Sequence, residues 1–332
     1  MASRESDIIK NINEIVKSNR FNEGTVVSIG DDTALVDTGS KLSLITTDAM
    51  VEGTHFIMDK IPPKDIGWKC AISNISDIAA MGGTPQYAVT TIGISEKTSD
   101  EWIQSLYQGI EEGLKTYGAY IVGGDTVKSP ITFINITLTG IPYYDERSNP
   151  MWLARNSAKP GDLIVVTGSL GGSSLGLSLV DDDPSIRNQN PGWNRHIHPE
   201  ANIKTAQLAL SCGVRTGMDI SDGLIVDLEK IALASEHDIE VKLSDVPIFE
   251  ELKEQFGLRT AQDMALTSGE EYELILIADK QKVDDLLKQK VKGLSVIGQV
   301  LKSNPIEPSV TVVTDKGSVY LPSKSSWQHF EE

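Results

Sequence analysis

Five short acidic stretches, spread along the chain, place Asp beside Gly, Ser or Thr. They are Gly30-Asp31-Asp32, Thr46-Thr47-Asp48, Asn74-Ile75-Ser76-Asp77, Gly123-Gly124-Asp125-Thr126 and Asp219-Ile220-Ser221-Asp222-Gly223. Carboxylate, hydroxyl and carbonyl oxygens are the ligands that hard divalent cations such as Mg²⁺ prefer, and small neighbours let a polyphosphate approach the ions closely. Together the stretches predict one site for magnesium and phosphate.

Any one of these stretches also has a purely structural explanation. An Asp beside Gly is most often a turn residue, because its side chain bonds the nearby backbone and Gly supplies positive φ. Asp77 is harder to explain in this way, since the spacing of Ala and Ile in residues 66–81 predicts a helix. A carboxylate buried on such a helix needs a metal ion or a cationic neighbour, unless it faces solvent.

The stretch around Asp219 and Asp222 lies at a predicted strand-to-helix junction, where Asp219 or Ser221 could serve simply as an N-cap. A helix N-terminus favours anions and opposes cations, so two carboxylates there indicate metal held between protein and phosphate. The glycine-rich turn at residues 168–176 follows a predicted strand. It could cradle an anion or merely permit tight packing.

The composition excludes several classes of protein. The 332 residues carry a formal net charge of −17, whereas nucleic-acid binding draws on clustered Lys and Arg. An acidic chain that handles phosphates needs metal cations to offset the mutual repulsion. The two cysteines, Cys70 and Cys212, form no CxxC pair, which favours a reducing compartment. The charged first residues, and the lack of an apolar run of about 18 residues, lead us to expect a soluble cytoplasmic protein.

Predicted strands and helices alternate along the chain, which favours an α/β or α+β architecture. A segment rich in Pro, Asn, Tyr and charge at residues 142–157 predicts a boundary between domains 1–145 and 150–332. The other local predictions are an opening helix at 7–17, a hairpin at 34–46, a strand at 119–122 that Gly123-Gly124-Asp125 closes, and a long surface loop at 185–199.

The common nucleotide-binding motifs and the usual zinc-hydrolase motif are missing from the sequence. The chain has no GxxxxGK[ST] phosphate loop, no GxGxxG fingerprint after a strand, and no kinase HRD or DFG set. It also has no HExxH zinc motif. The reaction type that remains is phosphoryl transfer, in which the enzyme positions the reactants and uses magnesium. Carboxylates are the main requirement for this chemistry.

The motifs closely resemble, in their order and their residues, those of thiamine-monophosphate kinases. Two further segments share this resemblance: Val51-Glu52-Gly53-Thr54-His55-Phe56 and Ala158-Lys159-Pro160-Gly161-Asp162. These enzymes belong to an ATP-using superfamily with aminoimidazole ribonucleotide synthetase. The resemblance implies a two-domain synthetase-like fold, in which the N-terminal domains of a homodimer share a β-barrel and the C-terminal domain is α/β. It also implies the reaction ATP + thiamine phosphate → ADP + thiamine diphosphate, with several Mg²⁺ ions.

The resemblance also carries roles over to particular residues. The implied metal ligands are Asp31, Thr46, Thr47, Asp48, Asp77, Asp125, Asp219 and Asp222. Of these, Asp77, Asp125 and Asp219 are the residues we expect to be catalytic, acting through magnesium. The implied nucleotide contacts are Tyr107, Gly124, Asp125, Arg155 and Ser221. The implied contacts to thiamine phosphate are His55, Glu271 and Trp327.

Two positions depart from the family pattern. Glu271 stands where the family usually has Asp, which adds one methylene to the carboxylate's reach. Lys128 stands where the family commonly has Arg, so a point charge replaces a bidentate fork. Neither change removes an implied metal ligand.

Other functions remain open at this point. Selenophosphate synthetases and the hydrogenase-maturation relatives use a reactive Cys near one end of the chain. Here Cys70 lies in a predicted helix, and the last residues contain no Cys. Another ATP-using enzyme of cyclase type is a further alternative. A sensor that binds nucleotide or metal without catalysis is the alternative from a different class, and ATP consumption dependent on thiamine phosphate would separate it from a kinase.

Overall fold

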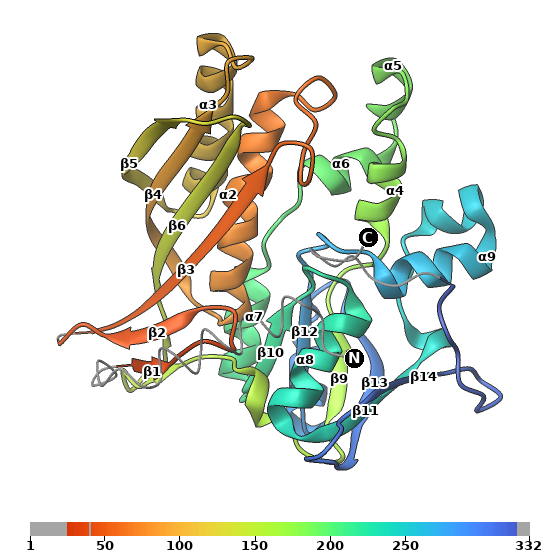
Figure 1. Ribbon diagram of the computed structural model, residues 1–332. Helices are drawn as coiled ribbons and strands as arrows, with labels where there is room; N and C mark the ends of the chain where they lie inside the picture. Colours follow the sequence, from red (N-terminus) through yellow and green to blue (C-terminus); the bar gives the residue numbers. More distant parts are fainter. Residues whose placement is uncertain (1–24, 40, 324–332) are drawn as a thin grey trace.

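The computed structural model describes residues 25–39 and 41–323, which form two large sheets with helices packed against them (Figure 1). This arrangement confirms the expected mixture of strands and helices. The predicted helix at 7–17 and Trp327 lie outside the described residues. Within the described ranges, no helix is both long and apolar enough to cross a membrane.

The N-terminal sheet has six strands in the order β1-β2-β3-β6-β4-β5. They are β1 (Thr25–Val27), β2 (Ala34–Asp37), β3 (Leu42–Val51), β4 (Thr84–Ile94), β5 (Tyr120–Lys128) and β6 (Phe133–Ile141). Neighbours are antiparallel except β4 and β5, which run parallel and are connected through a helix. In the described part of the chain β1 and β5 are edge strands, so this sheet does not close on itself.

Helices α2 (Pro63–Ala80) and α3 (Asp100–Thr116) cover one face of this sheet (Figure 1). Helix α2 is buried almost all round, and Ile75 at its centre is fully inaccessible. The two helices approach closely because Gly109 has no side chain. A Cβ atom there would lie only 1.8 Å from the carbonyl oxygen of Lys64.

The C-terminal sheet has the order β10-β12-β9-β13-β11-β14. Its strands are β9 (Leu163–Val166), β10 (Thr216–Asp219), β11 (His237–Lys242), β12 (Leu274–Ala278), β13 (Ser295–Ser303) and β14 (Val310–Val313). The helices of this half are α4 (Gly172–Ser178), α5 (Pro184–Arg187), α6 (Pro191–Ile197), α7 (Ile203–Ser211), α8 (Leu224–Ser235), α9 (Glu250–Thr267) and α10 (Lys280–Lys288). Short elements at β7 (Tyr143–Tyr144), β8 (Pro150–Met151), η1 (Arg155–Ser157) and η2 (Leu243–Asp245) complete the order.

Helices cover both faces of the C-terminal sheet. In β12, Ile275 belongs to the core on the α8 side, whereas Leu274 and Leu276 belong to the core that includes α7 and α10. A strand covered on both faces reads as a continuous apolar run rather than an alternating one. This explains the uninterrupted Leu-Ile-Leu-Ile-Ala sequence of β12.

The structure confirms the hairpin at residues 34–46 and the helix predicted at 66–81. The predicted strand at 119–122 is longer than expected, because β5 continues through the two glycines and Asp125 while pairing with β4. The division into domains 1–145 and 150–332 falls between the two sheets and stays a prediction.

The prediction of a long surface loop at residues 185–199 was wrong. The segment contains most of α5 and all of α6, and Trp193 and His196 on α6 are buried. A local signal for α6 was present, because Asn190 accepts the N–H of Gly192 and Pro191 occupies the first turn. Helix α9 was missed because Gly257, with a φ of 74°, interrupts its pattern.

The contact between α2 and α3 gives a first prediction. We expect Gly109→Ala to lower the free energy of unfolding by about 1–3 kcal/mol, since its Cβ would press on the backbone of α2. Gln108→Ala, at an exposed position of the same helix, is the control and should have little effect. Denaturant unfolding measures both, and equal midpoints would contradict the proposed close approach.

Candidate active site

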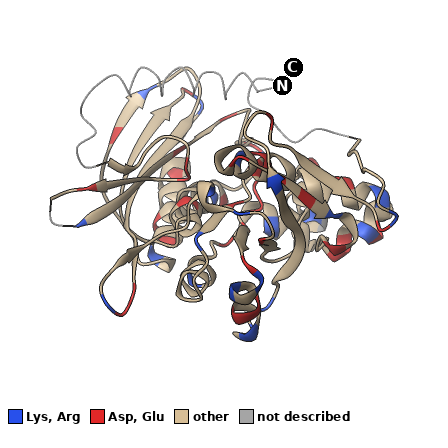
Figure 2. Ribbon diagram, turned by 90° about the horizontal axis from the view of Figure 1, so that it is seen from below, with Lys and Arg blue, Asp and Glu red and all other residues tan. Residues whose placement is uncertain are grey.

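Three carboxylates from distant parts of the chain meet between two halves of the molecule. The N-terminal half is the first sheet with α2 and α3, and the C-terminal half is the second sheet with its helices. Asp32 lies just before β2, Asp77 lies in the last turn of α2, and Asp219 ends β10. Each offers one oxygen, and these oxygens all lie within 4.8 Å of one another. Figure 2 shows acidic positions on ribbons inside the molecule as well as along its outer helices. This spacing of hard oxygen ligands suits a divalent cation.

Without a cation, this cluster is electrostatically unfavourable. Burial, followed by repulsion from Asp48, Asp219 and Asp32, holds the pKa of Asp77 well above its ordinary value. Burial and then the charge of Asp32 raise the pKa of Asp219. The Oδ2 atom of Asp219 accepts a hydrogen bond from Ser76 Oγ at 2.6 Å, but its buried Oδ1 has no hydrogen-bond partner. A divalent cation fits this donor set, because it would offset the repulsion and engage the free oxygen.

Strand β3 brings two more of the predicted site residues, Thr46 and Asp48, close to Asp77. Thr46 Oγ1 donates a hydrogen bond to Asp77 Oδ2. The backbone N–H of Asp48 donates to Asn74 Oδ1 at 3.1 Å, which ties the strand to α2. Asn74 and Asp77 are three residues apart and so share one helix face. The Asn-Ile-Ser-Asp motif therefore fastens β3 and presents a carboxylate beside it.

Arg155 neutralises part of the cluster from the C-terminal side. Its Nη2 atom lies 2.7 Å from Asp32 Oδ1, and its backbone N–H donates to Asp31 Oδ2 at 3.3 Å. Burial, and then repulsion from Asp32, raise the pKa of Asp31 to about 7. The guanidinium group thus links the loop before β2 to η1.

The turn between β10 and α8 is organised by a residue that sequence reasoning missed. The Oδ2 atom of Asp227 accepts the backbone N–H groups of Ser221, Asp222 and Gly223 at 3.0, 3.1 and 3.2 Å. Asp227 is fully buried, and its other oxygen is paired with Lys230. The available signal was an acidic residue in the first turn of a predicted helix, a position that such residues favour.

A second turn, residues 268–273, lies against the first. The N–H of Glu270 donates to Ser221 O at 2.7 Å, so the two turns are hydrogen-bonded. Glu271 is buried over the glycine-rich turn, where its Oε1 atom accepts from Gly171 N, Ser173 N and Ser268 Oγ. Burial raises the pKa of Glu271 to about 7 despite the nearby charge of Arg195, whose Nη2 atom lies 3.6 Å from Glu271 Oε2 without forming a hydrogen bond.

A buried lysine connects the two halves beside this turn. Lys69 of α2 is 4% exposed, and its Nζ atom lies 2.6 Å from Glu270 Oε2 and 3.4 Å from His196 Nε2. The positive charge of Lys69, acting against burial, keeps the pKa of Glu270 below its usual value, and His55 adds to this effect. His55 therefore lies near Glu270. Sequence reasoning identified His55 but gave no reason to select Lys69, because its partners are distant in the chain.

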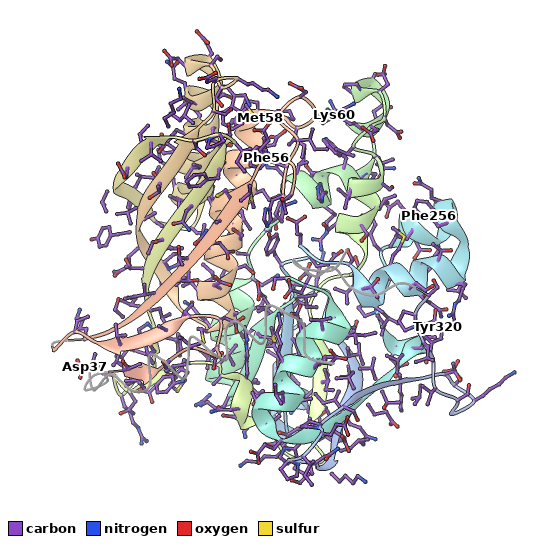
Figure 3. The ribbon with its side chains drawn as sticks, viewed as in Figure 1. Asp37, Phe56, Met58, Lys60, Phe256 and Tyr320 are labelled. Carbon is purple, nitrogen blue, oxygen red and sulfur yellow. The ribbon has the colours of Figure 1, made fainter. Side chains whose placement is uncertain are left out.

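His55 lies in the loop that leads from β3 to α2. Its Nδ1 atom accepts the backbone N–H of Val51 at 3.1 Å, which fixes the orientation of the ring. Figure 3 shows the following residues Phe56, Met58 and Lys60 between β3 and the helices α4 to α6. The loop thus bridges the two halves at the end of the site where the thiamine phosphate was expected.

Other predicted site residues lie on the opposite face of the N-terminal sheet. Successive side chains of a strand alternate between faces, so Thr47 points away from α2, and its hydroxyl lies beside Asn135 and Thr137. Asp125 shares that face, because its register partner Thr91 is also the partner of Asn135. Within one chain, Thr47 and Asp125 are therefore separated from Asp77 by the sheet.

Two further predicted nucleotide contacts lie away from the carboxylate cluster. Tyr107 of α3 forms a hydrogen bond with Thr90 Oγ1 at 3.0 Å, between the helix and the sheet. Gly124 lies on the exposed edge strand β5. A Cβ atom at Gly124 would come within 2.1 Å of Thr90 O, so the glycine permits the close pairing of β4 and β5.

Both halves of the chain match known family models. Residues 30–142 match the AIR synthase related protein, N-terminal domain, and residues 159–310 match the corresponding C-terminal domain. The fold and the acidic site therefore define a member of the AIR synthase related proteins.

Comparison with individual relatives identifies a narrower family within the AIR synthase related proteins. A thiamine-monophosphate kinase of Haemophilus influenzae is 32% identical over 100% of this chain and 99% of the relative. One of Bacillus subtilis is 32% identical over 92% of this chain and 94% of the relative. A solved structure described as AaThiL complexed with AMPPCP and TMP matches with a TM-score of 0.81 and 28% identity, covering 99% of both chains. The chain belongs to the thiamine-monophosphate kinase family.

The burial of Glu271 predicts a dependence of stability on pH. Its folded pKa, about 7, lies above the ordinary value of 4.5, so the folded state holds the proton more tightly than the unfolded state. The stability from this proton is present at pH 4 and is lost as the pH rises toward and beyond 7. Relative to Glu271→Gln, wild type should lose on the order of 3 kcal/mol over that range.

Denaturant unfolding at several pH values between 4 and 8 measures this difference. Gln keeps a carbonyl oxygen for the donors around Oε1 but does not titrate. Glu111→Gln, at an exposed position of α3, controls for the general effect of removing one carboxyl group. A wild-type curve parallel to that of Glu271→Gln across the whole range would contradict the prediction.

Proposed function

We propose that this chain transfers the γ-phosphoryl group of ATP to thiamine monophosphate, which yields ADP and thiamine diphosphate. The observation that carries the proposal is the convergence of Asp32, Asp77 and Asp219 between the two halves. The relatives named thiamine-monophosphate kinase, and the AaThiL structure with a nucleotide analogue and TMP, support the choice of substrates. The free cysteines Cys70 and Cys212 are in keeping with a cytoplasmic location.

The reaction needs no covalent enzyme intermediate. A phosphate monoester has its second pKa near 6, so the acceptor is largely ionised at neutral pH without a strong general base. A terminal oxygen of its phosphate attacks the γ-phosphorus of ATP in line with the departing ADP. When bound, magnesium supplies the positive charge that offsets repulsion between the two phosphate groups and stabilises the leaving group.

The chain's own residues hold and align the reactants. The proposed magnesium ligands at the cluster are Asp31, Thr46, Asp48, Asp77 and Asp219, of which Asp77 and Asp219 are the central catalytic carboxylates. The carboxylate of Asp222, the other ligand implied beside them, is already paired with Lys230. Arg155 and Ser221 border the cluster, and we assign them to the nucleotide. His55 and Glu271 are assigned to thiamine phosphate, as is Trp327 beyond the described residues. At pH values above about 7, where Glu271 is ionised, its carboxylate would give a cationic thiazolium ring a partner of opposite charge.

A homodimer accounts for the remaining predicted residues. The face of the N-terminal sheet away from α2 and α3 exposes several large apolar side chains. They are Ile45 (37% exposed), Tyr87 (53%), Val89 (44%), Tyr120 (58%) and Val122 (61%). A contiguous apolar face of this kind, next to an open sheet edge, marks an interface. We propose that two copies pair here into a shared β-barrel, which brings Thr47, Gly124 and Asp125 of each chain toward its partner.

The catalytic assignment is tested by Asp219→Asn. We expect turnover to fall on the order of 10²–10³-fold or more, because this carboxylate stabilises charge in the transition state. Stability should not fall, since burial already disfavours the charged form of Asp219. The assay mixes protein, ATP, Mg²⁺ and thiamine monophosphate and follows thiamine diphosphate by mass spectrometry.

Surface Asp279→Asn is the matched control and should keep full activity. Reactions without metal or without thiamine monophosphate complete the comparison. Full activity in Asp219→Asn would refute the assignment. ATP binding without any product in wild type would instead favour a nucleotide sensor.

The dimer is tested by Val122→Glu on β5. A carboxylate on this apolar face would be buried without a partner, so we expect the variant to sediment as a monomer while wild type sediments as a dimer. Leu233→Glu replaces an equally exposed apolar residue, 69% exposed on α8, and should leave the dimer intact. Identical sedimentation of Val122→Glu and wild type would exclude this face as the interface.

A further inference from the structure

Lys230 bridges two carboxylates at the edge of the active site. Its Nζ atom lies 2.6 Å from Asp222 Oδ2 and 2.7 Å from Asp227 Oδ1. The Asp222 and Lys230 side chains are each 33% exposed, whereas Asp227 is fully buried. The ammonium group therefore lies between a buried anion and one that solvent and ions can reach.

The position of Lys230 is determined by a rigid surrounding. Asp227 cannot easily turn away, because its other oxygen accepts three backbone N–H groups of the turn that precedes α8. Lys230 follows Asp227 by three residues on the same helix face. Two carboxylates within 2.7 Å of its Nζ atom favour the charged ammonium form of Lys230.

In the described part of the chain, the central carboxylates Asp77 and Asp219 form no such direct ion pair. Among residues 25–39 and 41–323, no Lys or Arg nitrogen lies within salt-bridge distance of Asp77 or Asp219. A divalent cation can therefore supply the counter-charge at Asp77 and Asp219, whereas the carboxylate of Asp222 already has an ammonium partner in Lys230.

We infer that the Lys230 ammonium replaces a divalent cation at Asp222, so that the ions of this active site bind on the Asp77 and Asp219 side only. The inference refines the proposed function and rests on it, because it concerns the metal content of the same site. An ammonium group has three N–H donors, and the two carboxylates use two of them. The third is available for a phosphate oxygen of the nucleotide, which gives Lys230 a direct role in place of a metal ion.

The experiment counts divalent ions by titration with Mn²⁺, followed by calorimetry and by the electron paramagnetic resonance signal of free Mn²⁺. Wild type, Asp222→Asn and Lys230→Met are compared, with and without a non-hydrolysable ATP analogue. We expect Asp222→Asn to bind as many ions as wild type. Lys230→Met leaves two carboxylates without their cation, so it should bind one additional ion per chain. The double variant should lose that ion again.

Matched controls separate this effect from a general change of charge. Lys282→Met breaks a Lys–Asp pair of the same three-residue spacing on α10, with Nζ 2.8 Å from Asp279, and should leave the ion count unchanged. Lys230→Arg keeps the charge and should also behave as wild type. Loss of one ion in Asp222→Asn would overturn the inference, as would an unchanged count in Lys230→Met.

The comparison of wild type with Asp222→Asn decides the question even if Lys230→Met does not fold. Because ion counting requires no turnover, the result does not depend on which acceptor the enzyme phosphorylates. An inactive wild type with the expected ion counts would refute the proposed reaction and leave the inference about Lys230 in place.

Discussion

Repulsion among buried carboxylates is the constraint on which the rest of this structure depends. Asp32, Asp77 and Asp219 are held within 4.8 Å of one another in a place that water reaches poorly. Bringing like charges together at low dielectric costs free energy, so the surrounding fold must impose the arrangement. Closely spaced carboxylate oxygens of this kind suit a divalent cation, which the proposed phosphoryl transfer needs.

Well-packed elements, rather than flexible loops, hold these carboxylates together against their repulsion. Helix α2 carries Asp77 and is buried against α3, the N-terminal sheet and the C-terminal half, so its last turn cannot move without disrupting both cores. Asp219 ends a fully buried strand. The turn that follows is fixed by Asp227, whose carboxylate accepts hydrogen bonds from three backbone N–H groups. Precise placement of ligands on rigid elements is what phosphoryl transfer without a covalent intermediate requires.

Three charged contacts compensate the acidic site where it meets the C-terminal half. Arg155 pairs with Asp32, Lys230 with Asp222, and Lys69 with Glu270. The pairs formed by Arg155 and Lys69 cross between the two halves, so they also set how these halves meet. Asp77 and Asp219 form no such ion pair among the described residues, and the buried Oδ1 atom of Asp219 has no hydrogen-bond partner.

The chemistry of this protein was readable from its residues, because ligand type and local turn geometry depend on near neighbours in the chain. Asp, Ser, Thr and Gly in short motifs predicted a magnesium and phosphate site, and helical spacing placed Asp77 on a helix. The residues that each motif contacts in the folded chain could not be predicted from near neighbours. Ser76 and Asp219 are separated by 143 positions, and Lys69 and Glu270 by 201, so only folding could bring them together.

The distribution of ligands between faces was likewise decided by tertiary structure. Thr46 and Thr47 are adjacent in the sequence, yet the alternation of side chains along β3 directs one toward Asp77 and the other to the opposite face. The packing of α2 and α3 decides which face of the sheet is covered by helices. The short sequence motif does not contain this information. The sequence by itself therefore determined which groups could bind metal and phosphate. The fold determined which of them meet within one chain, because side-chain direction and long-range packing are properties of the assembled sheet.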